Sequence, residues 1–490
     1  MEQLNLIESL HRLAAVRALR PAIVAPKGTL SWAKLEALVW ASAQQWHETG
    51  LRPGDRVGLT LSRPLVHLMT SLALTRIGVG QVSLPASESV SVRDSVSRRL
   101  GLKLVLTDPG AESLSVPTWA IEGLPDRDVT EQERLRIRSR ELDAPWLIVQ
   151  SSGTTGAPKF AEVSHRRAIE RLQRSLHLFE RRPDDLFWAA SRLDFTVAKQ
   201  RTYFNLLAGT PICLPLGLQG MADIVTFLKA QRVTLACGAP SHLYSLVDQG
   251  EALPSIRAFE ARSAVISESL RRAFRSRVSS RLFVVYATNE GEALSIASPE
   301  LQDCIPDTVG VPTGSVQLQI VDEEGAVLPP GQTGEIRARG SGFVDGYLDN
   351  AGASARAFKE GWFYPGDMGY LTPEGALILQ GRTDDMMIFD GVNIFPAEIE
   401  QVLSAHPAVR EVAAFGWAHP RYQDIPVAAV TLLDRIAEAD LIRHCRERLG
   451  SKFPRRIFFL EELPKNPMGK VLKRELRAFA RNELADSGSE

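Results

Sequence analysis

The sequence predicts an α/β protein with a large N-terminal domain of α/β sheets that includes a β-rich subdomain, and a small α+β domain after it. Strand and helix patterns alternate from the N-terminus to about residue 290. Short strands with Gly- and Pro-rich connections then occupy 309–381, and a second pattern of helices and strands follows Gly381. Alternating strands and helices are typical of parallel sheets covered by helices, which gives the predicted class.

The elements follow from hydrophobic spacing, taken in order. In the alternating part we expect helices over 31–46 and 65–78, and strands over 57–61, 101–106, 146–149, 233–236 and 282–286. In the β-rich part we expect strands over 316–321, 334–339 and 376–379. In the last part we expect helices over 396–406 and 436–449, and strands over 409–417 and 427–433.

Composition excludes several classes of protein. The chain has 490 residues, 44% hydrophobic and 23% charged, which excludes disordered, collagen-like and disulfide-scaffold proteins. The net charge of −1 gives no bulk attraction to nucleic acid or to an anionic membrane, so neither partner is expected. The N-terminus has no signal-peptide pattern, and no apolar run reaches the roughly 18 residues of a membrane helix. We expect a cytoplasmic protein.

Cysteine usage agrees with that location. Cys213, Cys237, Cys304 and Cys445 show no paired spacing. Such scattered cysteines are typical of buried, reduced thiols and not of a zinc site or a disulfide framework.

A loop rich in Ser, Thr and Gly follows the expected strand at 146–149. Two glycines and several hydroxyl side chains allow backbone N–H groups to surround an anion, and a lysine adds positive charge. The loop residues that point to phosphate binding are Ser151, Ser152, Gly153, Thr154, Thr155, Gly156 and Lys159. It is not a Walker A loop, because Lys159 lies between Pro158 and Phe160. The alternative is an ordinary surface loop.

Four further segments stand in a fixed order after this loop. They are Tyr-Ala-Thr-Asn-Glu at 286–290, Gly-Trp-Phe-Tyr-Pro-Gly-Asp at 361–367, Gly-Arg-Thr-Asp-Asp at 381–385 continuing through 391–400, and Pro-Lys-Asn-Pro-Met-Gly-Lys-Val-Leu-Lys-Arg at 464–474. Together with the loop, they make nearly the whole chain resemble the adenylate-forming superfamily. That superfamily includes acyl- and aryl-CoA synthetases, peptide-synthetase adenylation domains and firefly luciferase.

The resemblance implies a set of nucleotide-binding roles. Tyr286 would stack on adenine, Asn289 would donate to the α-phosphate, and Glu290 would hold Mg²⁺, for which a carboxylate is a suitable hard ligand. Asp367 would accept both ribose hydroxyls, and Arg382 would reach ribose or phosphate. Within these motifs the chain departs from the family pattern at Ala287 for Gly, Asn289 for Thr and Pro365 for Thr, and Phe160 after the phosphate loop is a further departure.

The resemblance also implies a catalytic and a conformational role near the C-terminus. Lys470 would be the catalytic lysine that bridges the carboxylate and the α-phosphate, acting with Thr154, Lys159 and Glu290. Asp384 falls at the family's interdomain hinge, so we expect domains over 1–383 and 384–490, with the small domain mobile. In the family its rotation withdraws the lysine and forms a tunnel for the thiol.

Three segments correspond to the family's acid-binding pocket, and they give Asp194, Gly238, Ser263 and Ala264 as candidates. Asp194 would pair with an amine or hydroxyl of the substrate, since an unpaired buried carboxylate is costly. The alternative, that Asp194 is a helix N-cap before Thr196, is equally open at this point. Arg262 stands where Gly is usual, so the adenine edge or the pocket floor is expected to differ.

The expected function is that of an AMP-forming acid–thiol ligase. ATP and Mg²⁺ would convert an aryl or acyl carboxylic acid to an acyl-adenylate, and the acyl group would pass to CoA or to the phosphopantetheine thiol of a separate acyl carrier protein. The alternatives are a stand-alone amino-acid-activating enzyme and a nucleotide-binding homologue without catalysis. A luciferase-like oxygenase is not favoured by any residue. The sequence leaves open a monomer or a homodimer.

Overall fold

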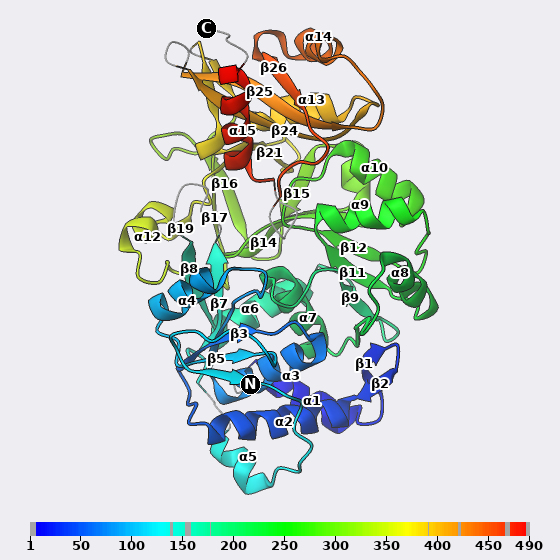
Figure 1. Ribbon diagram of the computed structural model, residues 1–490, viewed down its shortest axis with the longest axis vertical. Helices are drawn as coiled ribbons and strands as arrows, with labels where there is room; N and C mark the ends of the chain where they lie inside the picture. The colour runs from blue at the N-terminus through cyan, green and yellow to red at the C-terminus, as the bar shows by residue number, and fades with distance from the viewer. Residues whose placement is uncertain are drawn as a thin grey trace.

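The computed structural model describes residues 6–137, 141–151, 158–176, 178–390, 392–419, 423–465 and 471–486. It confirms the predicted class: a large α/β body carries a small α+β domain at one end (Figure 1). The described residues form three sheets of 6, 15 and 5 strands.

The six-stranded sheet is formed by the N-terminal part of the chain. Its strands, in spatial order, are β6 (Thr118–Ala120), β5 (Leu104–Thr107), β3 (Arg56–Thr60), β4 (Gly80–Ser83), β7 (Pro145–Ser151) and β8 (Lys159–Ser164). All neighbours pair in parallel except β7 and β8, which pair antiparallel. The helices of this region are α1 (Glu8–Val16), α2 (Trp32–Glu48), α3 (Pro64–Ile77), α4 (Val90–Arg99) and α5 (Glu131–Ile137). Ser31 caps α2 by accepting a hydrogen bond from the Lys34 N–H at 3.3 Å.

The 15-stranded sheet begins with the antiparallel pair β2 (Gly28–Ser31) and β1 (Pro21–Ala25), and it continues as a parallel α/β sheet from β1 to β13 (Leu282–Thr288). Between β1 and β13 lie, in spatial order, β10 (Ile212–Cys213), β9 (Phe187–Ala189), β11 (Leu235–Gly238) and β12 (Ala258–Ala261). Its helices are α6 (His165–Leu176), α7 (Thr196–Leu207), α8 (Met221–Ala230), α9 (Pro240–Gln249), α10 (Glu268–Arg277) and α11 (Pro299–Cys304). Strands β9, β11, β12 and β13 run parallel, so their carboxyl ends share one edge.

The same sheet continues into the β-rich part, where pairing becomes antiparallel. These strands are β14 (Glu292–Ala297), β15 (Thr308–Pro312), β16 (Gln317–Val321), β17 (Gly334–Arg339), β18 (Phe358–Lys359), β19 (Trp362–Phe363), β20 (Asp367–Leu371) and β21 (Leu377–Arg382). Helix α12 (Ala351–Ala357) lies in this part. The predicted β-rich part over 309–381 therefore continues the 15-stranded sheet and does not form a separate one.

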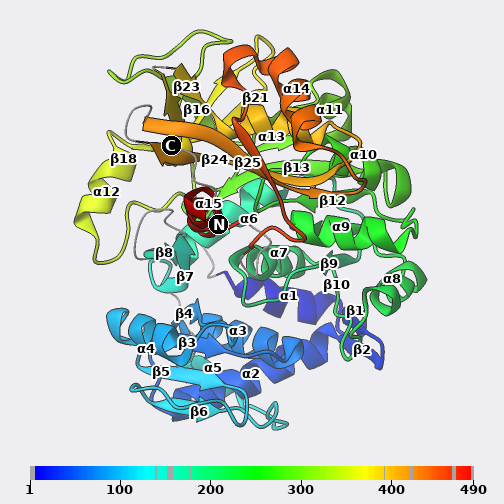
Figure 2. The ribbon, with the colours of Figure 1, turned by 45° about the horizontal axis from the view of Figure 1, so that its top comes forward.

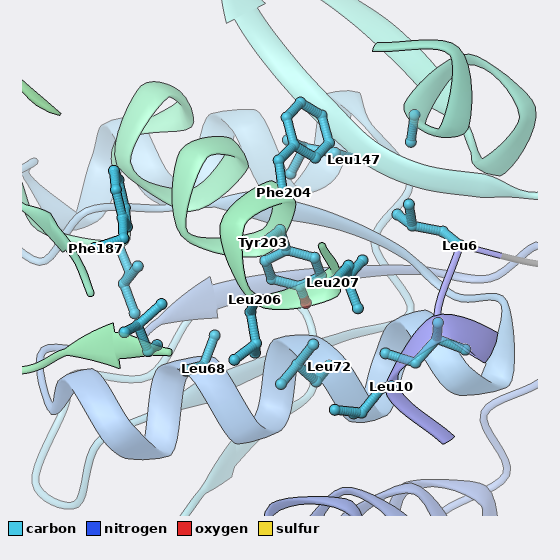
Figure 3. Packing of buried hydrophobic residues seen from close by; sticks show 14 of the residues in the cluster. Leu6, Leu10, Leu68, Leu72, Leu147, Phe187, Tyr203, Phe204, Leu206 and Leu207 are labelled. Atoms are coloured by element: carbon cyan, nitrogen blue, oxygen red, sulfur yellow. The ribbon is translucent and has the colours of Figure 1, made fainter. Parts of the chain in front are cut away.

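Helix α7 joins the two sheets of the large body. Every residue from Ala198 to Leu207 on it is buried, as expected for a helix that is covered on all sides. Tyr203, Phe204, Leu206 and Leu207 belong to one core cluster with Leu68 and Leu72 of α3 (Figure 3). This packing holds α7 against α3.

The small domain is built on its own sheet. Its elements are β22 (Met387–Phe389), β23 (Val392–Ile394), β24 (Val409–His419), β25 (Gln423–Leu432), β26 (Arg456–Phe459), α13 (Pro396–Ser404), α14 (Glu438–Leu449), α15 (Lys473–Asp486) and the 3-10 turns η1 (Thr383–Asp385) and η2 (Gly450–Lys452). It contacts the large body near α9 and α10 (Figure 2). Arg410 pairs with Asp248 at 3.2 Å, and Gln401 donates to Asp307 Oδ2 at 2.5 Å.

Element types agree with the sequence predictions, while boundaries shift by a few residues. The strand expected from residue 101 begins at Leu104, because Gly101 has a φ of +60° and lies in a turn. One cysteine prediction is wrong: Cys304 is exposed, since it ends the short helix α11 at the surface, whereas the other three cysteines are buried. Within the described ranges, no helix is long and apolar enough to cross a membrane.

Candidate active site

The site is expected where strand ends of the two large sheets meet. β7 ends at Ser151, where the Ser/Thr/Gly-rich loop begins, and β13 ends just before Asn289 and Glu290. The side chain of Asn289 donates to the Gln150 carbonyl at 2.6 Å. The structure thus brings the start of the phosphate loop and the 286–290 segment together, although they are far apart in sequence. Ligands of open α/β sheets bind at such edges.

Tyr286, Asp367 and Arg382 form one hydrogen-bonded group. The Tyr286 hydroxyl donates to Asp367 Oδ2 at 2.5 Å, and the Arg382 guanidinium donates to Asp367 Oδ1 at 3.1 Å. Asp367 and Arg382 are register partners on β20 and β21, which places both at the sheet end. Burial, and then the charge of Asp367, raise the pKa of Tyr286 well above its usual value. The phenol therefore stays protonated and serves as a donor.

A second group surrounds Glu290, which is buried. Tyr347 donates from its hydroxyl to Glu290 Oε1 at 2.8 Å. The ammonium of Lys159 lies 5.3 Å from the centre of the Tyr347 ring, and the Ser151 side chain is near enough to the same phenol to oppose the rise in its pKa. Tyr347 thus connects three residues that the sequence identified, yet sequence reasoning missed Tyr347 itself. It lies outside every motif that was singled out, and no spacing signal marked it.

Two arginines of α6 hold the backbone that carries Glu290. Arg171 donates to the Glu290 carbonyl at 2.7 Å and to the Gly342 carbonyl at 2.8 Å. Arg174 donates to the Gly291 carbonyl. Both guanidiniums are buried, so these contacts fix the turn after β13. The i, i+3 spacing of two arginines on one helix was the available sequence signal.

Behind this turn lies a buried ion network. Arg262 pairs with Glu260 at 2.7 Å and with Glu292 at 2.9 Å, Arg201 pairs with Glu260, and Arg174 reaches Glu292 at 4.0 Å. Burial alone would raise the pKa of Glu292. The positive charges of Arg262, Arg201 and Arg174, of which Arg262 contributes most, lower this pKa to about 2. The side chain of Arg262 therefore points into the protein, and it does not fill the expected ligand site.

The acid-pocket candidates follow the carboxyl ends of β9, β11 and β12. Gly238 is buried at the end of β11 and accepts a hydrogen bond from the Arg262 N–H at 3.0 Å. Ser263 and Ala264 form the bend after β12, with Ser263 at a φ of +82°. Because parallel neighbours end together, these residues and Asp194, which follows β9, share one sheet edge.

Asp194 is buried and is not a helix cap. The N-cap of α7 is Phe195, with no side-chain capping bond, so the N-cap interpretation of Asp194 is wrong. Its Oδ2 accepts from Arg192 at 2.7 Å, while its Oδ1 is buried without a partner among the described residues. Nearby, Lys199 donates to Ser83 Oγ at 3.2 Å, and the buried Nε2 of His67 has no hydrogen-bond partner in the described part of the chain.

The Lys199–Ser83 contact extends the site across both sheets. Lys199 belongs to α7, which follows β9, whereas Ser83 ends β4 beside β7. Burial lowers the pKa of the Lys199 ammonium to about 7, although Asp194 opposes the shift. Sequence reasoning missed both Lys199 and His67, since an isolated lysine or histidine on an apolar helix carries no motif.

Several predicted residues lie outside the described residues. They are Ser152, Gly153, Thr154, Thr155, Gly156 and Lys470. Asp384 is described and lies in η1 between β21 and β22, at the passage from the large body to the small domain.

Comparisons with known proteins agree with this arrangement. The profile of the AMP-binding enzyme family matches residues 10–348, and that of the AMP-binding enzyme C-terminal domain matches 398–470. The chain is 26% identical over 479 residues to a 2-succinylbenzoate–CoA ligase of Bacillus subtilis, covering 95% of this chain and 96% of the relative. It is 32% identical over 342 residues to an indoleacetate–CoA ligase of Aromatoleum aromaticum, covering 68% and 67%.

A solved structure of a CoA synthetase is similar to this protein over nearly the whole fold. The o-succinylbenzoate CoA synthetase (MenE) of Bacillus subtilis, in complex with its acyl-adenylate intermediate OSB-AMP, superposes with a TM-score of 0.86 at 25% identity. The match covers 97% of this chain and 98% of that structure. The chain therefore belongs to the AMP-binding enzyme family of the adenylate-forming superfamily, and it is an AMP-forming acid–thiol ligase.

Proposed function

We propose that this ligase activates a carboxylic acid bearing a polar substituent, and that it passes the acyl group to CoA. The acid's carboxylate oxygen attacks the α-phosphorus of ATP, the bond to pyrophosphate breaks, and an acyl-adenylate forms. A thiolate then attacks the acyl carbon, and AMP leaves. The observation that carries the proposal is the convergence of Lys159, Glu290 and the Tyr286–Asp367 pair where the two large sheets meet.

On the nucleotide side, the proposal assigns one task to each group. The ring of Tyr286 stacks on adenine, and Asp367 accepts the ribose hydroxyls. Both oxygens of Asp367 already accept a hydrogen bond, from Tyr286 and from Arg382, and a carboxylate oxygen is able to accept more than one. Lys159 and the loop N–H groups neutralise the phosphates, which makes pyrophosphate a better leaving group.

The residues fit a magnesium ion that arrives with its nucleotide. In the described part of the chain, no group of three or more His, Cys, Asp or Glu residues is placed to hold a metal. Mg²⁺ is commonly held by one or two carboxylates together with substrate phosphates, so the single carboxylate of Glu290 suits it. When bound, the ion would neutralise charge on the phosphates.

For the second half-reaction, we propose that the small domain, 384–490, turns about Asp384 relative to the large domain, 1–383. Lys470 would serve adenylate formation in one orientation and leave the site in the other. CoA is the preferred acceptor, because the relatives above are named CoA ligases. A separate carrier protein is the alternative.

The proposed class of acid rests on Asp194 and on the acids for which the relatives are named. Two relatives are named for acids that carry an aromatic ring, 2-succinylbenzoate and indoleacetate. A buried carboxylate oxygen without a partner is costly, and a hydroxyl or an amine of the substrate would satisfy Asp194 Oδ1. An amino acid meets the same requirement, so amino-acid activation is the second candidate.

Asp194→Ala tests this assignment. We expect kcat/KM for a hydroxyl- or amino-substituted acid to fall by about tenfold to a hundredfold, the loss of one hydrogen bond to a charged group. The unsubstituted analogue should lose little. The measurement is pyrophosphate release over a panel of aryl, fatty and amino acids, for wild type and variant. Equal losses for substituted and unsubstituted acids would contradict the assignment.

The same panel measures the catalysis itself, against the alternative of a nucleotide-binding protein without catalysis. Acid-dependent pyrophosphate release from any acid of the panel supports the catalyst. Binding of ATP without pyrophosphate release from any acid would favour a nucleotide-binding protein without catalysis. The three buried cysteines, free of disulfides, support our proposal of a cytoplasmic enzyme.

A further inference from the structure

We infer that Tyr347 is a positioning residue of the ATP site, which keeps the carboxylate of Glu290 and the ammonium of Lys159 apart and available for magnesium and phosphate. This inference rests on the proposed function of the site. It concerns a residue outside all the motifs that identify the family in this sequence, and it depends on contacts that only the fold brings together.

Tyr347 contacts both charged groups. Its hydroxyl donates to Glu290 Oε1 at 2.8 Å, and the Lys159 ammonium lies over its ring, 5.3 Å from the centre. In the parts of the chain that the structure describes, Lys159 forms no ion pair. Without Tyr347, these opposite charges would be free to neutralise each other, and neither would then be ready for the nucleotide.

The backbone around Tyr347 holds it at this place. The Val344 N–H donates to the Glu290 carbonyl at 3.0 Å, and the Leu348 N–H donates to the Phe160 carbonyl at 2.7 Å. The segment 344–348 therefore spans from the turn that carries Glu290 to the strand that begins with Lys159. Tyr347 lies between these two anchors, so its position relative to both charges is set by main-chain bonds.

Helix α12 and an aromatic neighbour complete the support. The Tyr347 N–H donates to Ser354 Oγ at 2.9 Å, and its ring meets the ring of Phe358 edge-on at 5.6 Å. Burial, and then the charge of Glu290, raise the pKa of the Tyr347 phenol. The hydroxyl therefore stays protonated near neutral pH and donates to the carboxylate. Such charge-assisted bonds are stronger than neutral ones.

The test compares ATP binding with and without metal. Tyr347→Phe removes the hydroxyl but keeps the ring under Lys159. We expect the dissociation constant of ATP in excess Mg²⁺, measured by titration calorimetry, to rise about tenfold, the scale of one hydrogen bond to a charged group. ATP binding in EDTA should change less than about twofold, because Glu290 then has no metal to hold. A residue that served only stability would weaken both titrations equally.

Two further variants separate the hydroxyl from the ring. Tyr347→Leu also removes the cation–π platform, so ATP binding in EDTA should weaken as well, by about two- to fivefold. In Glu290→Gln, adding Tyr347→Phe should change MgATP binding less than twofold, because the hydroxyl acts through the lost carboxylate. Additive losses in this double-mutant cycle would overturn the inference.

Tyr203→Phe provides the matched control. The Tyr203 hydroxyl is buried and donates to Ser71 Oγ at 2.7 Å, in the core and away from Glu290. Its loss should lower the melting temperature without changing the ratio of the two dissociation constants. An unchanged ratio in Tyr347→Phe would overturn the inference. A wild type that binds MgATP but activates no acid would refute the proposed function and leave this test intact.

Discussion

At the scale of single residues, the most informative groups are buried polar atoms without partners. Within the ranges that the structure describes, Asp194 Oδ1 and His67 Nε2 are two such atoms, and the Lys199 ammonium donates to the Ser83 hydroxyl. Native proteins satisfy nearly all buried polar groups, so such atoms call for an explanation. Near Asp194 the explanation we propose is the substrate, whose polar substituent would complete these bonds.

Lys199 also predicts a pH dependence of stability. Its pKa is lowered by burial to about 7 from the ordinary 10.5. Between pH 7 and 10.5 the unfolded chain therefore binds more protons than the folded one, and Lys199 makes stability rise with pH, by at most about 1.4 kcal/mol per unit. Lys199→Met should remove this contribution.

Urea denaturation at several pH values measures it. From pH 7 to 9.5, the free energy of unfolding of wild type should rise relative to that of Lys199→Met. Lys229→Met is the control, because Lys229 is half-exposed and pairs with Glu251 at the surface. Parallel pH curves for wild type and Lys199→Met would contradict a buried, partly neutral lysine.

At the scale of elements, the sequence predicted most strands and helices and part of the site. The apolar residues of β13 and β17 and the amphipathic spacing of α13 are local patterns, so the sequence predicted these elements directly. Contacts set by tertiary packing could not. Tyr347 reaches Glu290, and Arg262 turns inward to Glu292, through folding and not through spacing.

The same reasoning explains the one wrong alternative for Asp194. Its place before Thr196 suggested a helix cap, but the chain enters α7 one residue later, at Phe195. The orientation of a buried side chain is decided by tertiary packing, which no local pattern specifies.

The ion network between β12, β14, α6 and α7 gives a prediction at this scale. Arg262→Ala leaves the buried carboxylates of Glu260 and Glu292 without their shared partner. We expect it to lower the free energy of unfolding by about 3–5 kcal/mol, the usual cost of breaking a buried ion pair from one side. Chemical denaturation measures this loss.

Arg272→Ala is the matched control, because Arg272 is exposed and pairs with Glu268 on the surface of α10. That change should cost less than about 1 kcal/mol. Comparable losses for the two variants would show that the buried network contributes nothing special.

At the scale of the whole molecule, one large body and one small domain must perform two half-reactions at one site. Lys159, Glu290, Asp367 and Arg382 are all supplied by the large body or its edge. Lys470 belongs to the small domain, and its role remains a prediction from the family resemblance. The contacts of Arg410 and Gln401 with the large body record one arrangement of the two parts.

Acid-dependent ATP–pyrophosphate exchange, measured for wild type and Lys470→Ala, tests the central claim most directly. We predict that wild type exchanges pyrophosphate only with its acid present. Lys470→Ala should lose the exchange by at least about a hundredfold, as expected when one transition-state contact is removed. It should keep its fold and still transfer acyl groups from preformed adenylate to CoA. Wild-type exchange without acid, or full exchange in Lys470→Ala, would contradict the account.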